Sequence, residues 1–351
     1  MNRAFCNACG KLVEATQQQR EGKVFLVKDC PDCGKSETLI SSDAQRYYTK
    51  RSLDGERPAP TGCFLKCLDC AHKNEPTFVF LDITNRCNSN CPICINNTPS
   101  MGFLFEPPLD YFEKVFEHFA RSYPRPVVQL FGGEPTVRED LFEIIALAKA
   151  AGLRPRVVTN GLRLADPEYC QRLVESRATI LFAYDGANPE TYRVLRGNEK
   201  HLSIKQKALD NLSHIEGAKV ALMTCMAKGF NDTETHDLLK FCHERRHFIR
   251  GIYFMPLAHT WKKEALDLDP ERITGEDIEQ IVDEAFPDGP VEFLPAMFIG
   301  QIPTLVKYLR IKPLPFAGAH PNCESMYPVS YTHLRAHETS LQLVCRLLLE
   351  K

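Results

Sequence analysis

The stretch FVFLDITNRCNSNCPIC, at residues 78–94, joins an apolar run to three cysteines in CxxxCxxC spacing. The run FVFLDI (78–83) is typical of a buried strand, and Cys87, Cys91 and Cys94 lie on the loop that follows. Cysteine thiolates hold [4Fe–4S] clusters, usually four to a cluster. Three thiolates on one loop therefore predict a cluster whose fourth iron is open to a ligand. A zinc site or a ferredoxin-like cluster is the alternative.

Downstream of this stretch, apolar runs alternate with helical segments. The runs are VVQLF (127–131), RVVT (156–159), TILFAY (179–184), KVALMT (219–224) and GIYFM (251–255). Helices are predicted over 109–120 and over 140–152, where Gly152 is a common helix stop. Six βα units in succession predict an α/β fold with a parallel sheet, either open or curled into a partial (β/α)6 barrel. In such sheets the chemistry lies at the carboxyl ends of the strands.

Short polar motifs follow the second, third and fourth predicted strands. FGGEP (131–135) supplies two glycines, which let the backbone approach a ligand closely, and a carboxylate that can accept from an amine. TNG (159–161) and YDGANPETY (184–192) place polar side chains at the next two strand ends. One such motif alone would most often be a turn, but three in order indicate a ligand site. The candidate residues are Gly132, Gly133, Glu134, Pro135, Asn160 and Asp185.

The first 50 residues carry two CxxC hooks, CNAC (6–9) and CPDC (30–33), around the strand-like KVFLV (23–27). Pairs of thiolates at this spacing bind one tetrahedral ion. A small unit with so little apolar core needs such a staple. The sequence thus predicts a zinc-ribbon or rubredoxin-like knuckle that holds zinc or a single iron. Its ligands would be Cys6, Cys9, Cys30 and Cys33.

A second CxxxCxxC triad, within GCFLKCLDC (62–70), precedes the first strand of the sheet. It predicts an auxiliary [4Fe–4S] cluster, with a zinc knuckle as the alternative. The candidate ligands are Cys63, Cys67, Cys70 and, from AHPNCES (319–325), Cys323. Isolated cysteines usually pack as small apolar side chains, which is the expectation for Cys170, Cys225 and Cys242.

Composition limits the remaining choices. The 351 residues have a formal net charge of −2, which gives no basic field for nucleic acid. The start has no signal-peptide pattern and no run is long enough to span a bilayer, so a cytoplasmic protein is expected. The helix predicted at 275–286 lies in a segment, 256–290, that is expected to be peripheral. The expected divisions are a knuckle (1–50), a linker with the second triad (51–77), a core (78–256), a truncated C-terminal extension (257–328) and a foreign tail (329–351) that resembles translated adapter sequence.

These motifs together resemble a subgroup of the radical S-adenosylmethionine (SAM) superfamily. Its members combine an N-terminal CxxC…CP segment, a GCxxxCxxC triad and TNRCNxxCPxC. The resemblance implies that the Cys87 loop holds the SAM-binding [4Fe–4S] cluster and that SAM is cleaved reductively to a 5′-deoxyadenosyl radical. It also implies that GGEP binds the methionine amino group, and that polar residues such as Asn160 and Asp185 contact the ribose or the carboxylate. A low-potential electron donor of the flavodoxin or ferredoxin type is the implied partner.

The same subgroup contains the tetraether lipid synthase and pterin-directed methyltransferases, so the resemblance implies more than one substrate. Activation of a substrate C–H bond, with coupling of lipid alkyl chains as the leading example, would require contact with a membrane surface. Methylation of a pterin-like ring, with SAM also as methyl donor, is the second interpretation. A non-catalytic iron–sulfur or zinc electron carrier is the third. A small-molecule or lipid substrate is expected in the first two cases.

Overall fold

The computed structural model describes residues 2–53, 78–122, 125–258, 266–286, 293–295, 322 and 325–327. The predicted ligands of the auxiliary cluster, Cys63, Cys67, Cys70 and Cys323, lie outside the described residues, as does the predicted foreign tail at 329–351. Within the described ranges, every helix is too short or too polar to cross a bilayer.

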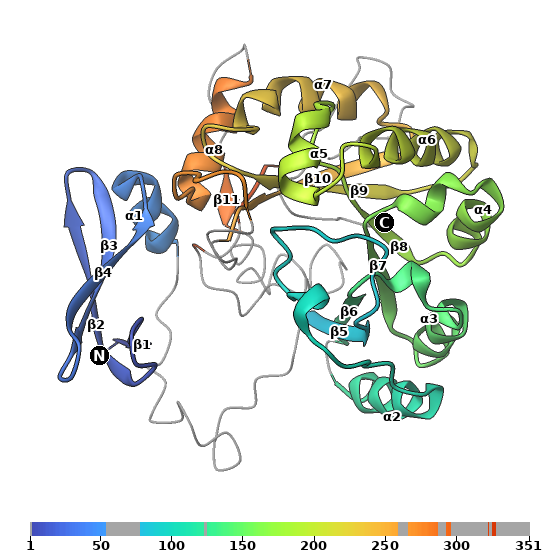
Figure 1. The fold of residues 1–351 in the computed structure, drawn as a ribbon, viewed down its shortest axis with the longest axis horizontal. Helices are drawn as coiled ribbons and strands as arrows, with labels where there is room; N and C mark the ends of the chain where they lie inside the picture. Colours follow the sequence, from blue (N-terminus) through green and yellow to red (C-terminus); the bar gives the residue numbers. More distant parts are fainter. Residues whose placement is uncertain are drawn as a thin grey trace, which may run out of the picture.

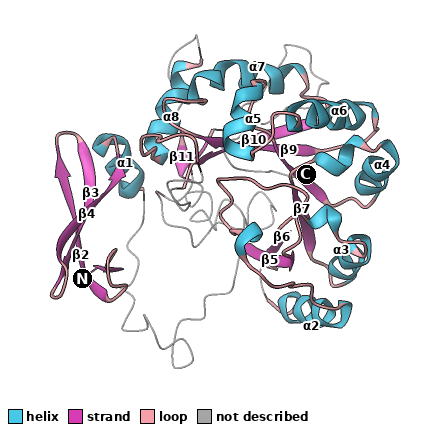
Figure 2. Ribbon diagram, in the orientation of Figure 1, coloured by secondary structure: helices cyan, strands magenta, loops and turns pink. Residues whose placement is uncertain are grey.

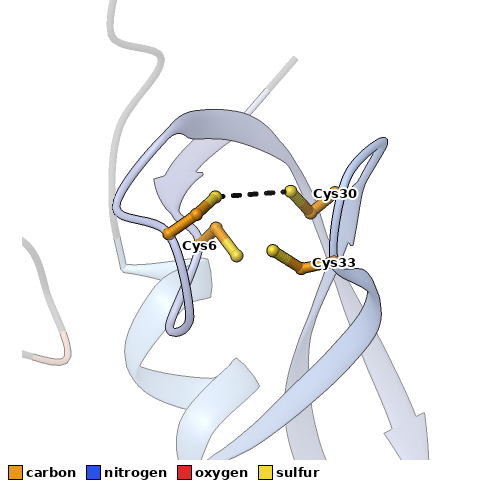
Figure 3. Close-up of side chains that lie close together, drawn as sticks. Cys6, Cys30 and Cys33 are labelled. Atoms are coloured by element: carbon orange, nitrogen blue, oxygen red, sulfur yellow. Dashed lines mark hydrogen bonds between the residues drawn. The ribbon is translucent and has the colours of Figure 1, made fainter.

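The N-terminal unit is an antiparallel sheet with one helix. Its strands pair in chain order and are β1 (Asn2–Phe5), β2 (Leu12–Arg20), β3 (Lys23–Cys30) and β4 (Gly34–Ser41). Strand β3 contains the predicted KVFLV strand and ends on Cys30, so the second hook forms the tight turn into β4. Helix α1 (Ala44–Ser52) follows and packs Ala44 and Tyr47 against Val24. The two cysteine hooks meet at one end of this sheet (Figure 3).

The rest of the described chain is built on a six-stranded parallel sheet whose strands are neighbours in chain order. They are β5 (Phe78–Thr84), β6 (Val127–Gly132), β7 (Arg154–Thr159), β8 (Thr179–Ala183), β9 (Val220–Met226) and β10 (Ile249–Pro256). Figure 1 shows the sheet as a curved wall with helices along its outer side. This is the predicted partial (β/α)6 barrel.

Helices form the crossovers, as Figure 2 shows by colour. They are α2 (Leu109–Ala120), α3 (Leu141–Ala150), α4 (Pro167–Glu175), α5 (Pro189–Arg196), α6 (His201–His214) and α7 (Thr235–Glu244), with short 3-10 turns η2 (Thr98–Ser100), η3 (Pro135–Val137), η4 (Leu162–Ala165) and η5 (Asp232–Glu234). Helix α2 has the predicted bounds. Helix α3 ends two residues before Gly152, whose φ of +74° is the left-handed conformation that stops a helix.

Register separates the two faces of the sheet. Leu81, Leu130, Val157 and Ile180 are aligned across β5 to β8 and are all buried in the core beneath the helices. Successive side chains of a strand point to opposite faces. The residues that alternate with this row therefore face the inside of the partial barrel.

For helix α8, the expectation that the segment 256–290 is peripheral is wrong. Helix α8 (Gly275–Glu284) buries Ile278 and Val282 in the barrel core. A row of acidic residues on the helix is also buried. Apolar patterning could not reveal this because the buried groups on that row are carboxylates.

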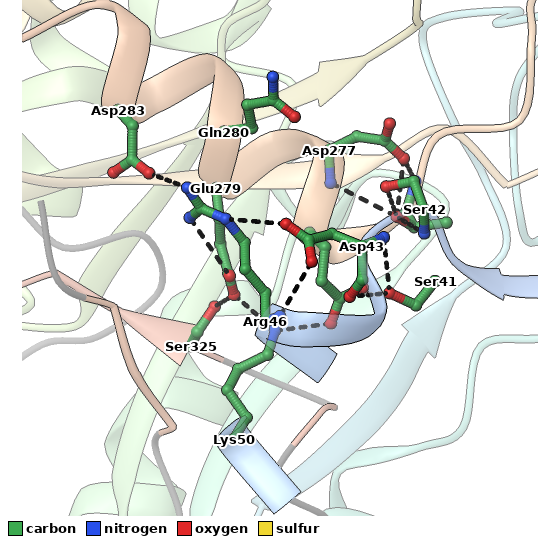
Figure 4. Close-up of polar contacts among 12 residues, drawn as sticks. Ser41, Ser42, Asp43, Arg46, Lys50, Asp277, Glu279, Gln280, Asp283 and Ser325 are labelled. Carbon is green, nitrogen blue, oxygen red and sulfur yellow. Dashed lines mark hydrogen bonds and ion pairs between the residues drawn. The ribbon is translucent and has the colours of Figure 1, made fainter. Parts of the chain in front are cut away.

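Cations of α1 pair with three of these carboxylates (Figure 4), and Lys228 pairs with the fourth, Asp277. Lys50 Nζ lies 2.7 Å from Glu276 and 2.6 Å from Glu279, and Arg46 pairs with Asp283. The short strands β11 (Leu294–Pro295) and β12 (Ser325–Met326) pair with each other, and Ser325 donates to Glu279. Helix α8 is therefore the joint between the N-terminal unit and the barrel.

Candidate active site and metal centres

The four cysteines of the N-terminal hooks are gathered as one ion requires. Their Sγ atoms all lie within 4.8 Å of one another, and Cys9 Sγ is 3.7 Å from Cys30 Sγ (Figure 3). Four thiolates around one zinc at about 2.3 Å place the sulfurs about 3.8 Å apart. Cys6 and Cys30 are buried, whereas Cys9 and Cys33 are exposed. The donor set fits zinc or a single iron.

The two hooks share one backbone plan. A glycine with positive φ follows each, Gly10 at +69° and Gly34 at +79°. In the first hook the backbone N–H groups of Cys9 and Ala8 point at the thiol of Cys6 and lower its pKa to about 6. The thiolate is the form that binds metal, so these N–H groups favour the form of Cys6 that can act as a ligand.

The loop with the second cysteine set begins where β5 ends and is braced on one side by residues 103–106. The backbone N–H of Asn85 donates to Phe105 O at 3.1 Å. Thr84 Oγ1 and Arg86 Nε both donate to Glu106 Oε1 at 2.7 Å. These bonds fix the chain on both sides of Asn85, immediately before Cys87.

The glycines of the GGEP motif are required by contact with this loop. Gly133 N donates to Thr84 O at 2.7 Å, and Glu134 N donates to Arg86 O at 2.8 Å. A Cβ on Gly132 would lie 2.1 Å from Thr84 O, and one on Gly133 would lie 2.1 Å from Arg86 O. No side chain fits at either position, so the end of β6 can run against the start of the cysteine loop only as glycine.

The Glu134 carboxylate joins the ends of β6 and β7. It is buried and accepts from Thr136, from Thr159 Oγ1 at 2.7 Å and from Asn160 N at 2.6 Å. Burial raises its pKa, although these hydrogen bonds act in the opposite direction. Its oxygens are thus engaged by the protein itself, and a contact with an incoming amine stays a prediction.

Asn160 also contacts the cysteine loop directly. Its Nδ2 donates to Asn88 Oδ1 at 2.7 Å, one residue beyond Cys87. The predicted residues at the second and third strand ends are therefore gathered against the cysteine loop.

Asp185, at the end of β8, is buried and bound on two sides. Arg196 of α5 donates to both of its oxygens, each at 2.7 Å, and Cys225 N donates at 3.0 Å. Burial alone would raise the pKa of Asp185, but the Arg196 charge and hydrogen bonds hold it below its usual value. Gly197, next to Arg196, packs so closely on Asn90 that a Cβ there would lie 2.8 Å from Asn90 O. The YDGANPETY motif (184–192) thus contacts the cysteine loop through α5.

Comparison with known proteins agrees with this arrangement. The Radical SAM superfamily profile matches residues 81–242, and the HMPTM N-terminal zinc ribbon domain matches residues 2–42. Residues 81–242 thus form a radical SAM domain. The chain carries a zinc ribbon ahead of this domain.

Relatives share these parts to different extents. The 7,8-dihydro-6-hydroxymethylpterin dimethyltransferase of Methanocaldococcus jannaschii is 32% identical over 334 residues, which cover 91% of this chain and 66% of that protein. The GTP 3′,8-cyclase of Listeria welshimeri is 28% identical over 209 residues, 55% of this chain and 59% of the cyclase. The crystal structure of methylornithine synthase superposes with a TM-score of 0.45 at 15% identity, covering 70% of this chain and 68% of that one. The chain thus spans less than two thirds of the length of these two curated relatives.

A radical SAM domain implies a [4Fe–4S] cluster and SAM. The assignment of this cluster to Cys87, Cys91 and Cys94 stays a prediction. When bound there, the cluster would supply the electron for reductive cleavage of SAM. Cys87 is exposed and Cys91 and Cys94 are half-buried, so the thiols stand at the surface of a braced loop. Among the described residues only the N-terminal hooks gather their ligand atoms to within 4.8 Å. Three cysteine thiolates on one loop are the donor type that a [4Fe–4S] cluster takes.

Two buried cations of the radical SAM domain were not predicted. Arg196 pairs with Asp185, as described above. Lys205 of α6 is 1% exposed, and its Nζ donates to Ala183 O at 2.6 Å. Burial lowers the pKa of Lys205 to about 8. Arg196 could have been suspected from the sequence, because a basic residue at the end of the helix that follows YDG can reach back to Asp185. Lys205 gives no such signal, because in sequence it resembles an ordinary surface lysine of a helix. The isolated Cys170, Cys225 and Cys242 are buried as predicted.

Proposed function

We propose that this radical SAM protein methylates a carbon of a pterin-like ring. The observation that supports this most is the extent of the similarity to the pterin dimethyltransferase, which covers 91% of the chain and so includes both the zinc ribbon and the barrel. The cyclase similarity covers 55% of the chain. The combination of the two parts favours the dimethyltransferase as the guide to substrate.

The chain's own residues prepare the site for such a reaction. Gly132 and Gly133 bring the end of β6 against the cysteine loop. Glu134 ties the ends of β6 and β7 together, and Arg196 ties Asp185 to α5. A site held at several strand ends can fix SAM and substrate in one geometry and exclude water from a reactive intermediate.

The other interpretations are weaker. Coupling of lipid alkyl chains gains no support from the relatives described above and stays a prediction, as does contact with a membrane surface. An electron carrier would not need a ring of strand-end motifs packed on the cysteine loop.

Anaerobic reconstitution with iron and sulfide tests the proposal. With SAM, dithionite and 7,8-dihydro-6-hydroxymethylpterin, we expect 5′-deoxyadenosine together with a pterin product one methylene unit heavier. S-adenosylhomocysteine as a further product would identify SAM as the methyl donor. Formation of 5′-deoxyadenosine with an unchanged pterin would refute the pterin substrate, and absence of 5′-deoxyadenosine would favour a carrier.

A further inference from the structure

The inner face of the barrel carries a row of side chains that belong to none of the strand-end motifs. Register aligns Phe80 of β5 with Gln129 of β6, and Gln129 with Arg156 of β7. These positions alternate with the outward row that packs beneath the helices, so they face inward. Neighbouring strands are about 4.8 Å apart, which places the three side chains side by side on the concave face seen in Figure 1.

Gln129 and Arg156 have little exposed surface and no polar partner among the described residues. They are 5% and 7% exposed, and neither side chain makes a hydrogen bond or an ion pair within the described ranges. The Arg156 guanidinium lies over the ring of Phe78, 5.4 Å from its centre. None of their polar atoms is among the fully enclosed, unpaired side-chain atoms of the described residues, so both groups stay open to a ligand inside the barrel. An amide and a guanidinium in adjacent ladder positions favour a polar ligand.

Phe80 supplies a flat apolar surface in the same row. It is 54% exposed although it lies in the middle of a strand, and it meets the edge of Phe131 at 5.6 Å and 80°. Asp82, aligned with Phe131 in the next inward row, adds an exposed carboxylate on the side of the cysteine loop. An aromatic ring beside amide, guanidinium and carboxylate groups is the lining expected around a planar polar ligand.

We infer that Phe80, Gln129 and Arg156 form the recognition surface for a flat, nitrogen-rich heterocycle of the pterin class, an inference that rests on the proposed function. The amide of Gln129 can pair with a ring edge that carries neighbouring C=O and N–H groups, since it offers both an acceptor and a donor. Arg156 donates to ring oxygens or nitrogens, and Phe80 stacks on the ring. A hydrocarbon chain would leave both polar groups unsatisfied, so the row disfavours a lipid at this position.

Binding of 7,8-dihydro-6-hydroxymethylpterin to the reconstituted protein with SAM, measured by anaerobic equilibrium dialysis, tests the inference. We expect Gln129→Leu and Arg156→Met each to raise Kd at least about tenfold, the loss of one good hydrogen-bonded pair. Iron content and Tm should stay at the wild-type value, because neither side chain has a described polar partner to lose. Matched controls are Gln171→Leu on α4 and Arg121→Met after α2, both exposed, and these should bind the pterin normally.

The outcomes separate the two proposals. If the wild-type protein binds and methylates the pterin while both variants keep their affinity within twofold, this inference is overturned and the proposed function stands. If the wild-type protein cleaves SAM but does not bind the pterin, the proposed function is overturned and this inference with it. Should Gln129→Leu lower Tm, Gln129→Glu carries the test, because it keeps the shape and replaces the amide donor with an acceptor.

Discussion

Replacement of Lys50 by methionine is a sharp test of how the zinc ribbon is joined to the barrel. Lys50 Nζ lies 2.7 Å from Glu276 and 2.6 Å from Glu279, and the three side chains are 6%, 3% and 5% exposed (Figure 4). Methionine keeps the length and the apolar stem of lysine but removes the charge. The variant therefore leaves two buried carboxylates facing an apolar side chain.

The structure sets the size of the effect. Removal of one partner from a buried ion pair costs about 3–5 kcal/mol, because the remaining charge is left without compensation. Glu279 keeps the hydroxyl of Ser325 and the more distant Arg46, 4.0 Å away. Glu276 has no other ion pair among the described residues. We therefore expect the lower end, about 3 kcal/mol, or a fall in Tm of about 6 °C or more.

Urea unfolding and thermal melting of the metal-loaded protein measure this change. Lys114→Met is the matched control, since the pair of Lys114 with Asp110 is 77% and 62% exposed and should contribute less than about 0.5 kcal/mol.

A triple variant separates charge from packing. In Lys50→Met combined with Glu276→Gln and Glu279→Gln, no buried charge is stranded, so most of the lost stability should return. A loss below about 1 kcal/mol in Lys50→Met would refute the reasoning, and so would a triple variant as unstable as the single one.

Three further predictions concern the cysteine loop, Lys205 and the ribbon. Gly133→Ala would place Cβ 2.1 Å from Arg86 O, so we expect severalfold less iron in this variant after reconstitution. The control Gly275→Ala meets nothing within 4 Å and should retain iron. Equal iron content in the two variants would contradict the role of this contact. Burial lowers the pKa of Lys205 from 10.5 to about 8, so the folded chain loses this proton before the unfolded chain does. The free energy of unfolding should therefore increase by about 3 kcal/mol between pH 8 and 10.5, and Lys205→Met should remove this increase. Urea unfolding of both proteins across this pH range measures it. The same pH dependence in both proteins would contradict the prediction. Chelation of the ribbon metal, or Cys30→Ser, should abolish hydrogen-exchange protection over residues 2–41, because the apolar cluster around the hooks is small. Protection that survives metal loss would show that the sheet does not depend on the ion.

Much of the fold could be predicted because its determinants are local. The apolar runs that became β6 to β10 are mostly buried, the run that became β5 is buried on one face, and amphipathic α2 has the predicted bounds. The N-terminal metal site could be predicted because each CxxC spacing places two thiolates on one ion, and two such pairs complete a tetrahedral site. The positions after the strands could be proposed as a site because parallel strands end at one edge.

The rest depends on contacts between distant segments. Helix α8 was expected to be peripheral since its buried groups are acidic. Their partners lie far away in sequence: Lys50 and Arg46 are more than 200 residues earlier, and Lys228 pairs with Asp277. The interior row depends on register, which aligns Gln129 with Arg156 only in the folded sheet. Glu134 was predicted as a ligand group, and the bonds to Thr159 and Asn160 that engage it come from another strand.

The central claim is that Cys87, Cys91 and Cys94 hold the cluster at which SAM is cleaved. Anaerobic reconstitution of Cys91→Ala, followed by incubation with SAM and dithionite and measurement of 5′-deoxyadenosine, tests it most directly. Cys170→Ala is the matched control, because Cys170 is buried in the helical core away from the loop. We predict that Cys91→Ala forms no 5′-deoxyadenosine while Cys170→Ala forms it at the wild-type rate. Undiminished 5′-deoxyadenosine from Cys91→Ala would contradict the account.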